Sequence, residues 1–163
     1  MALSDVRAIV TGAGGGLGLA AAQRIASLGG SVVMLDLPNS KGEEHAKAIG
    51  GNAIFCPTDV TKPDEVSAAL DVVEKAFGVV NTAINCAGII IGAKTISKKG
   101  PHDLQAFMKI LEVNTGGSFN VCRLAADRMQ HLDADELGLR GVMVNTASIA
   151  AFEGQMGQVA YAA

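Results

Sequence analysis

A serine and a tyrosine near the end of the chain carry hydroxyl groups that could take part in acid–base chemistry. Ser148 lies in the segment NTASIAAF, and Tyr161, thirteen positions later, is the only tyrosine in the sequence. A phenol can act as a base when a nearby cation lowers its ordinary pKa of about 10. A neighbouring hydroxyl can hold the substrate oxygen by hydrogen bonding. Without further context, Ser148 would be a helix or turn cap and Tyr161 a half-buried surface residue.

A glycine-rich turn near the N-terminus has the composition of a phosphate-binding site. The segment TGAGGGLG, residues 11–18, lacks G-x-G-x-x-G spacing, because Leu17 stands where the third glycine would fall. It fits T-G-x-x-x-G-x-G with Gly12, Gly16 and Gly18. Such glycines let a pyrophosphate approach the main chain, and the helix that follows offers unpaired N–H groups. The alternative is a glycine-rich turn that binds no ligand.

An acid at the end of the next apolar run indicates which dinucleotide this turn would bind. Asp36 follows the run SVVML and lies eighteen residues beyond Gly18. A carboxylate there can accept hydrogen bonds from both hydroxyls of an adenosine ribose, and it would repel a 2′-phosphate. No Arg or Lys lies within the glycine turn. The pattern favours NAD over NADP, and the alternative for Asp36 is a cap on the next turn.

Alternating apolar runs and helical patterns predict the elements that position these residues. Short apolar runs typical of buried strands occupy residues 6–10, 32–35, 53–56, 79–84 and 142–144. Helical patterns cover residues 17–28, 63–77 and roughly 103–132. The alternation predicts an α/β, Rossmann-like doubly wound parallel sheet with strand order 3-2-1-4-5 and helices on both faces. No internal repeat or linker interrupts residues 1–163, which are expected to form one domain.

Composition argues against several other function classes. The net charge of −3 provides no basic surface, so nucleic acid is not an expected partner. No apolar run is long enough to cross a membrane, and the N-terminus lacks the pattern of a signal peptide. The three cysteines are odd in number and widely spaced, which indicates neither a disulfide framework nor a metal site. We expect a reducing compartment, the cytoplasm or alternatively the mitochondrial matrix.

Taken in order, the motifs resemble those of the short-chain dehydrogenase/reductase family over the full length of the chain. After the glycine turn come Asp59-Val60, the segment NCAG at 85–88, Asn114, and the pair Ser148 and Tyr161. The resemblance implies that the catalytic residues are Asn114, Ser148 and Tyr161, and that Ser148 and Gln155 contact the substrate. It implies an NAD site formed by Gly12, Gly16, Leu17, Gly18, Asp36, Asp59, Val60, Asn85, Ala87 and Gly88.

Three of these residues also have structural interpretations that need no ligand. Asp59 could cap the helix that starts at Pro63, and Asn85 could be a turn residue at a strand end. Asn114 is unfavourable within a helix, and so is the pair Gly116-Gly117 that follows it. A local break in the helix is therefore expected there. The alternative to a catalytic Asn114 is a helix kink without chemistry.

The segments LDLPNS, NCAGI and NTASIAAFEGQMGQVAY resemble a branch of the family that oxidises 3-hydroxyacyl-CoA thioesters with NAD. This resemblance implies a homotetramer with a small-molecule alcohol, an acyl-CoA or a hydroxysteroid, as substrate. The family has a lysine four positions after the tyrosine, whereas this sequence ends after two alanines. We therefore expect the N-terminal part of a longer dehydrogenase, without the later strands and largely inactive by itself. The fifth strand would be left as an apolar edge of the sheet. The alternative is a non-catalytic dinucleotide-binding module or scaffold.

Overall fold

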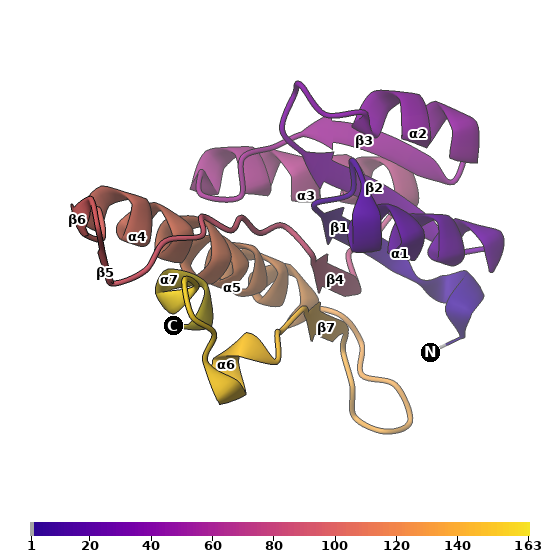
Figure 1. Ribbon diagram of the computed structural model, residues 1–163. Helices are drawn as coiled ribbons and strands as arrows, with labels where there is room; N and C mark the ends of the chain where they lie inside the picture. The colour runs from indigo at the N-terminus through magenta and orange to yellow at the C-terminus, as the bar shows by residue number, and fades with distance from the viewer. Residues whose placement is uncertain (1) are drawn as a thin grey trace.

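The computed structural model describes residues 2–163, and a five-stranded parallel sheet forms its centre (Figure 1). Its strands in chain order are β1 (Arg7–Thr11), β2 (Ser31–Asp36), β3 (Ala53–Pro57), β4 (Thr82–Asn85) and β7 (Val142–Asn145). Their order across the sheet is β3-β2-β1-β4-β7. Because β7 corresponds to the fifth predicted strand, this order confirms the predicted Rossmann-like sheet.

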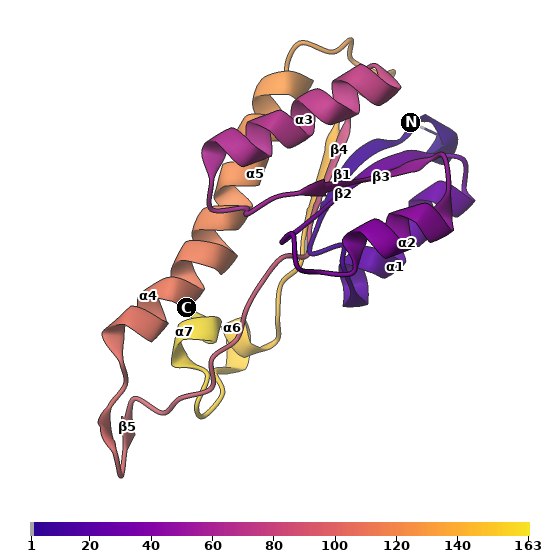
Figure 2. The ribbon, with the colours of Figure 1, turned by 90° about the horizontal axis from the view of Figure 1, so that it is seen from above.

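Helices cover both faces of the sheet, as Figure 2 shows most clearly. One face carries α1 (Gly16–Ser27) and α2 (Gly42–Ile49), and the other carries α3 (Pro63–Phe77) and α5 (Ser118–Met129). The helix α2 lies between β2 and β3. The alternation of strands and helices implies a helix there, but no hydrophobic pattern in the sequence gives its bounds. The bounds of α3 agree with the predicted 63–77, since Pro63 suits a first helical turn.

Two apolar cores fill the space between the sheet and its helices. Ile9, Val33 and Leu35 belong to the core under α3 and α5, whereas Val10 and Met34 belong to the core under α1 and α2. Successive residues of a strand point to opposite faces, so β1 and β2 contribute to both cores. The strand ends are thereby fixed between two packed layers, which positions the turns that follow them.

The start of β4 differs from the prediction because of one asparagine. The apolar run begins at Val79, but β4 begins at Thr82. The side chain of Asn81 accepts a hydrogen bond from Arg7 N at 2.8 Å and donates one to Asp5 O at 2.8 Å. Asn81 therefore joins the amino ends of β1 and β4, outside the strand itself.

The helical pattern over 103–132 is interrupted, as the residues around Asn114 predict. The helix α4 (Leu104–Leu111) leads into a π-helical segment η2 (Glu112–Gly117), which leads into α5. Asn114 and the two following glycines lie within η2. Asp103 caps α4, because its Oδ1 accepts a hydrogen bond from Gln105 N at 2.9 Å. Such π segments widen a helix by one residue and are frequent at functional sites.

The strand β7 lies at the edge of the sheet, as the sequence predicts for the fifth strand. The run 142–144 is apolar, which is typical of a strand that a complete sheet buries on both faces. In the structure Val142, Met143 and Val144 are each at least 36% exposed. Among the described residues β7 pairs only with β4, so it forms an apolar edge.

Several short elements are not predicted by the sequence patterns. They are η1 (Leu3–Asp5), the hairpin β5 (Ile96–Ser97) and β6 (Gly100–Pro101), and the helices α6 (Ala150–Glu153) and α7 (Val159–Ala162). Each is too short to show a clear hydrophobic period. Within residues 2–163, no helix combines the length and the apolar character that a membrane span requires.

Candidate active site

A pocket of about 440 Å³ opens at the carboxyl ends of the strands, where ligands bind in doubly wound sheets. It brings together a subset of the predicted cofactor residues, namely Gly12, Asp36, Asp59, Val60, Ala87 and Gly88. Gly16, Leu17, Gly18 and Asn85 lie in or beside the same turns without lining it. The remaining lining residues are Gly15, Leu35, Leu37, Thr58, Cys86, Ile89, Lys109 and Val113.

The glycine turn is packed so closely that side chains are excluded from it. Gly12 has φ of 65°, and a Cβ atom there would lie 2.8 Å from Ala87 N. A Cβ atom at Gly18 would collide with the carbonyl group of Gly12. By contrast, Gly15 and Gly16 face open space. The turn therefore brings bare main chain to the pocket wall, which suits the close approach of a pyrophosphate.

Asp36 connects the end of β2 to the glycine turn. Its Oδ2 accepts a hydrogen bond from Gly14 N at 2.8 Å, and its Oδ1 accepts one from Leu37 N at 2.7 Å. Each carboxylate oxygen can accept more than one hydrogen bond, so both retain capacity toward the pocket. An anchored carboxylate with free acceptor sites suits a diol such as the ribose of an adenosine.

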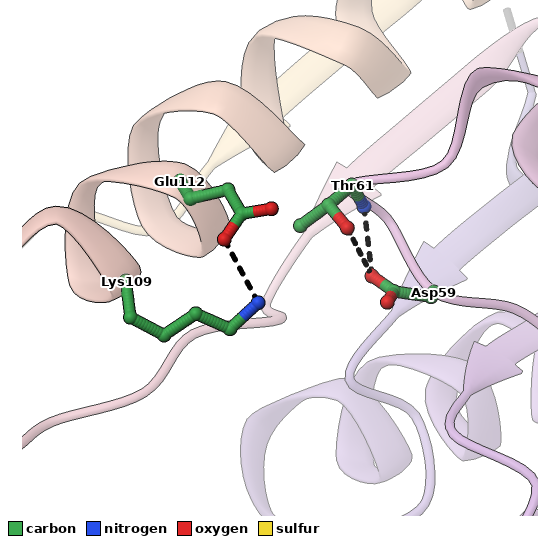
Figure 3. A network of polar contacts seen from close by, with 4 residues as sticks. All are labelled: Asp59, Thr61, Lys109 and Glu112. Atoms are coloured by element: carbon green, nitrogen blue, oxygen red, sulfur yellow. Dashed lines mark hydrogen bonds and ion pairs between the residues drawn. The ribbon is translucent and has the colours of Figure 1, made fainter. Parts of the chain in front are cut away.

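Asp59 is held at the pocket wall by the residue two positions later (Figure 3). Its Oδ1 accepts hydrogen bonds from Thr61 N at 2.9 Å and Thr61 Oγ1 at 2.8 Å. Burial raises the pKa of Asp59, but these hydrogen bonds and the charges of Lys109 and Lys62 outweigh it and lower that pKa below its usual value. The carboxylate is therefore kept ionised and oriented.

Lys109 approaches the same pocket from α4 (Figure 3). Its Nζ lies 2.9 Å from Glu112 Oε2. The hydrogen bond with Glu112 raises the pKa of Lys109 above its usual value. Desolvation opposes this shift, and the negative charges of Glu112 and Asp59 add to it. A persistent positive charge therefore faces the ionised Asp59 at this end of the pocket.

We expect Asp59→Asn to change how stability depends on pH. Because the pKa of Asp59 is lowered on folding, its contribution is fully present above the unfolded-state pKa of about 3.9 and is lost as pH falls through the lower folded-state value. Urea unfolding should show wild type more stable than the variant at neutral pH, with the difference vanishing in acid. Asp64→Asn, in the first turn of α3, controls for the loss of a carboxylate. If the stability difference between wild type and Asp59→Asn stayed constant into acid, the lowered pKa of Asp59 would be contradicted.

The turn after β4 is tied to β1 and to the edge strand. Thr11 Oγ1 accepts hydrogen bonds from Cys86 N at 3.1 Å and Ala87 N at 3.0 Å. Asn85 is only 4% exposed, and its Nδ2 donates to Asn145 Oδ1 at 2.8 Å. Asn85 Oδ1 has no hydrogen-bond partner among the described residues. These contacts fix the NCAG segment against the glycine turn.

Asn114 holds the chain just beyond that segment. Its Oδ1 accepts a hydrogen bond from Ile89 N at 2.8 Å, and its Nδ2 donates to Ile89 O at 2.9 Å. Asn114 does not itself line the pocket, but Ile89 does. The widened turn of η2 thus presents an amide that pairs with both polar groups of one residue, as a neighbouring strand would.

Tyr161 lies on the short helix α7, and Ser148 lies just before the short helix α6, which packs against α7. Ser148 Oγ accepts a hydrogen bond from Ala150 N at 3.2 Å at the start of α6, and the half-buried Tyr161 belongs to α7. The helix α7 also packs against α4 (Figure 2). Neither residue lines the 440 Å³ pocket. Both belong to a second region, beside the segment between β4 and β5.

The loop between α6 and α7 contacts that segment directly. Ala93 N donates a hydrogen bond to Gly157 O at 2.7 Å, and Ala93 forms a bridge with Gln158. Gln155 lies in this loop and is exposed. The chain that carries Ile89 along the pocket therefore continues to the loop between the predicted catalytic residues.

Sequence reasoning missed six residues of the pocket wall, which lie outside the predicted cofactor-binding motifs. They are Leu35, Leu37, Thr58, Ile89, Lys109 and Val113. Lys109 and Glu112 have the three-residue spacing of a helical ion pair, which was a usable signal. Val113 lies next to Asn114 in η2, and Thr58 and Ile89 adjoin segments that the motifs do mark.

The chain is similar to known proteins over nearly its whole length. Residues 7–163 match the family model described as short chain dehydrogenase. The chain is 51% identical over 158 residues to 3-hydroxyacyl-CoA dehydrogenase type-2 of Homo sapiens, covering 96% of this chain and 60% of that protein. It is 47% identical over 163 residues to the protein of the same name from Drosophila melanogaster, covering 99% and 64%.

A solved structure gives the same result. The crystal structure of 3-hydroxyacyl-CoA dehydrogenase type-2 from Mycobacterium avium has a TM-score of 0.92 at 37% identity, covering 98% of this chain and 62% of that one. The chain thus spans about 60% of the length of the curated relatives it matches. These matches confirm the resemblance of the motifs, and the chain belongs to the short-chain dehydrogenase family.

Proposed function

We propose that this chain carries the NAD site and the principal acid–base residues of a dehydrogenase that oxidises a secondary alcohol. The substrate class we propose is a 3-hydroxyacyl-CoA, with hydroxysteroids as further substrates, because relatives at 46–51% identity bear the name 3-hydroxyacyl-CoA dehydrogenase type-2. The observation that carries the proposal is the pocket at the strand ends, where the side-chain-free turn at Gly12 meets the anchored carboxylate of Asp36.

We assign a dinucleotide to this pocket and to the turns beside it. The turn with Gly12, Gly16, Leu17 and Gly18 would receive the pyrophosphate, and Asp36 would accept the ribose hydroxyls. Asp59 and Val60 would hold the adenine. Asn85, Ala87 and Gly88 would line the path toward the nicotinamide, which when bound supplies the acceptor for the hydride of the alcohol.

The residues of the second region would handle the alcohol itself. Ser148 would hold the substrate oxygen by a hydrogen bond, and Tyr161 would take the hydroxyl proton at its Oη. Gln155 would contact the substrate from the loop between α6 and α7. Asn114, fixed on Ile89, would take part in relaying the proton onward. Because α7 packs against α4, which leads into η2, Tyr161 and Asn114 belong to one packed unit.

We further propose that residues 1–163 are the N-terminal part of a longer dehydrogenase that assembles as a homotetramer. The greater length of its relatives supports this proposal. The additional segment would supply the cation beside Tyr161, cover β7 and enclose the substrate. The protein would act in a reducing compartment, the cytoplasm or the mitochondrial matrix.

Cofactor preference tests the proposed site. We expect Asp36→Asn to weaken NAD binding by about tenfold, the size of one lost hydrogen bond to a charged group, and to improve NADP relative to NAD. Affinities for both dinucleotides would be measured in the complete protein. Glu44→Gln, an exposed acid of α2, is the matched control and should leave both affinities unchanged. An unchanged ratio of NAD to NADP affinity in Asp36→Asn would refute the assignment of Asp36.

A further inference from the structure

One buried amide outside the predicted site holds the wall of the cofactor pocket from behind. Asn120 lies in the first turns of α5 and is 7% exposed. Its Nδ2 donates a hydrogen bond to Val60 O at 2.9 Å, across sixty positions of the chain. Val60 lines the pocket, whereas Asn120 does not. The contact therefore connects α5 to the pocket wall without reaching any ligand.

The orientation of this amide is set by an arginine one turn later. Asn120 Oδ1 accepts hydrogen bonds from Arg123 Nε at 3.1 Å and Arg123 Nη2 at 2.7 Å. A guanidinium group can only donate, so it selects the oxygen of the amide and leaves the NH₂ group for the carbonyl of Val60. The exposed Arg123 thus fixes which way a buried side chain points.

The Val60 side chain is confined at the same place. A Cβ atom at Gly117 would lie 2.6 Å from Val60 Cγ2, so the main chain of η2 packs directly on this side chain. The preceding residues are fixed as well, since Thr58 N donates to Asp36 O at 2.8 Å. The segment from Thr58 to Val60 is consequently held at both ends.

The group that this support leaves free is the main-chain N–H of Val60. Among the described residues it has no hydrogen-bond partner, although Val60 is only 7% exposed. Because Val60 lines the pocket, an acceptor atom of a bound ligand could pair with this N–H. Holding the carbonyl of Val60 toward Asn120 stabilises the conformation in which this N–H stays available.

We propose that Asn120, oriented by Arg123, is a positioning residue that preorganises the adenine end of the dinucleotide pocket. The inference rests on the proposed function, because it requires that a dinucleotide bind beside Val60. Without the amide, the 58–60 segment would occupy other conformations, and apparent affinity would fall in proportion to the competent fraction. The chemistry at Ser148 and Tyr161 would be unaffected once the cofactor is bound.

Asn120→Asp tests this role in the complete protein, since it replaces the donating NH₂ with an oxygen at nearly constant volume. We expect the Kd values for NADH and for ADP-ribose, which lacks nicotinamide, both to rise about tenfold, as for one lost buried hydrogen bond. The kcat at saturating NAD should stay within about twofold of wild type, because only binding is affected. Arg123→Met should raise both Kd values by about threefold. This variant tests the proposal if Asn120→Asp does not fold.

Asn81→Asp is the matched control. It removes the same kind of side-chain donation to a main-chain carbonyl, at 2.8 Å to Asp5 O, but at the opposite end of the sheet. It should lower the melting temperature without changing the Kd of either ligand. Three results would overturn the proposal. They are an equal loss of ligand affinity in Asn120→Asp and Asn81→Asp, unchanged affinity in the Asn120 and Arg123 variants, and a fall in kcat that parallels the loss of affinity. If the wild-type protein binds neither NADH nor ADP-ribose, the proposed function itself fails.

Discussion

Tyr161→Phe is expected to lower kcat about a thousandfold, the usual contribution of a positioned general acid or base. The substitution removes only the phenolic oxygen, so α7 should keep its packing against α4 and α6. Affinity for NADH should change by less than about twofold, because Tyr161 does not line the dinucleotide pocket. Steady-state turnover and NADH titration of the complete protein would measure both quantities.

Ser148 supplies the companion variant for this result. Ser148→Ala should also reduce kcat strongly, because the substrate oxygen loses its hydrogen bond, while NADH affinity is retained. The effects of the two substitutions should be far from additive, as expected of residues that act as a unit. Wild-type turnover in Tyr161→Phe would rule out this tyrosine as the proton acceptor.

Gly12→Ala is expected to abolish measurable cofactor binding and to destabilise the fold by about 2 kcal/mol or more. Gly12 adopts φ of 65°, and the added Cβ would press against Ala87 N and Cys86 O, both at 2.8 Å. The contact is with main chain that Thr11 already fixes, so it cannot be relieved by rotating a side chain. The glycine turn and the NCAG segment would have to separate.

Gly50→Ala separates this close contact from backbone strain alone. Gly50 also has positive φ, at 97°, but a Cβ atom there would meet nothing within 4 Å. Its substitution should cost only the backbone strain, about 1–3 kcal/mol, and leave NADH affinity unchanged. Thermal or urea unfolding and NADH titration would compare the two variants. Equal effects of Gly12→Ala and Gly50→Ala on binding would show that the glycine turn does not form the site.

The sheet could be predicted because its determinants are local and repetitive. Five apolar runs separated by helical segments allow few topologies once right-handed crossovers are required, and the observed strand order agrees. Pro63 and the spacing of apolar residues located α3. The irregular segment at Asn114 was also predictable, because an asparagine followed by two glycines disfavours a regular helix.

Other features depend on contacts between distant parts of the chain, which no local sequence pattern reveals. The contact between Asn120 and Val60 joins residues sixty positions apart. The close approach of Gly117 to the Val60 side chain likewise joins two distant parts of the chain. Motifs marked the positions of Ser148 and Tyr161, whereas only the fold shows that α7, which carries Tyr161, packs against α4 and α6.

The most direct measurement is NADH formation by the complete protein supplied with a 3-hydroxyacyl-CoA and either NAD or NADP. We predict turnover with NAD, much slower turnover with NADP, and loss of activity in Tyr161→Phe. Binding of NAD without any turnover on 3-hydroxyacyl-CoA or hydroxysteroid substrates would contradict the proposed dehydrogenase. It would identify the chain as a dinucleotide-binding module instead.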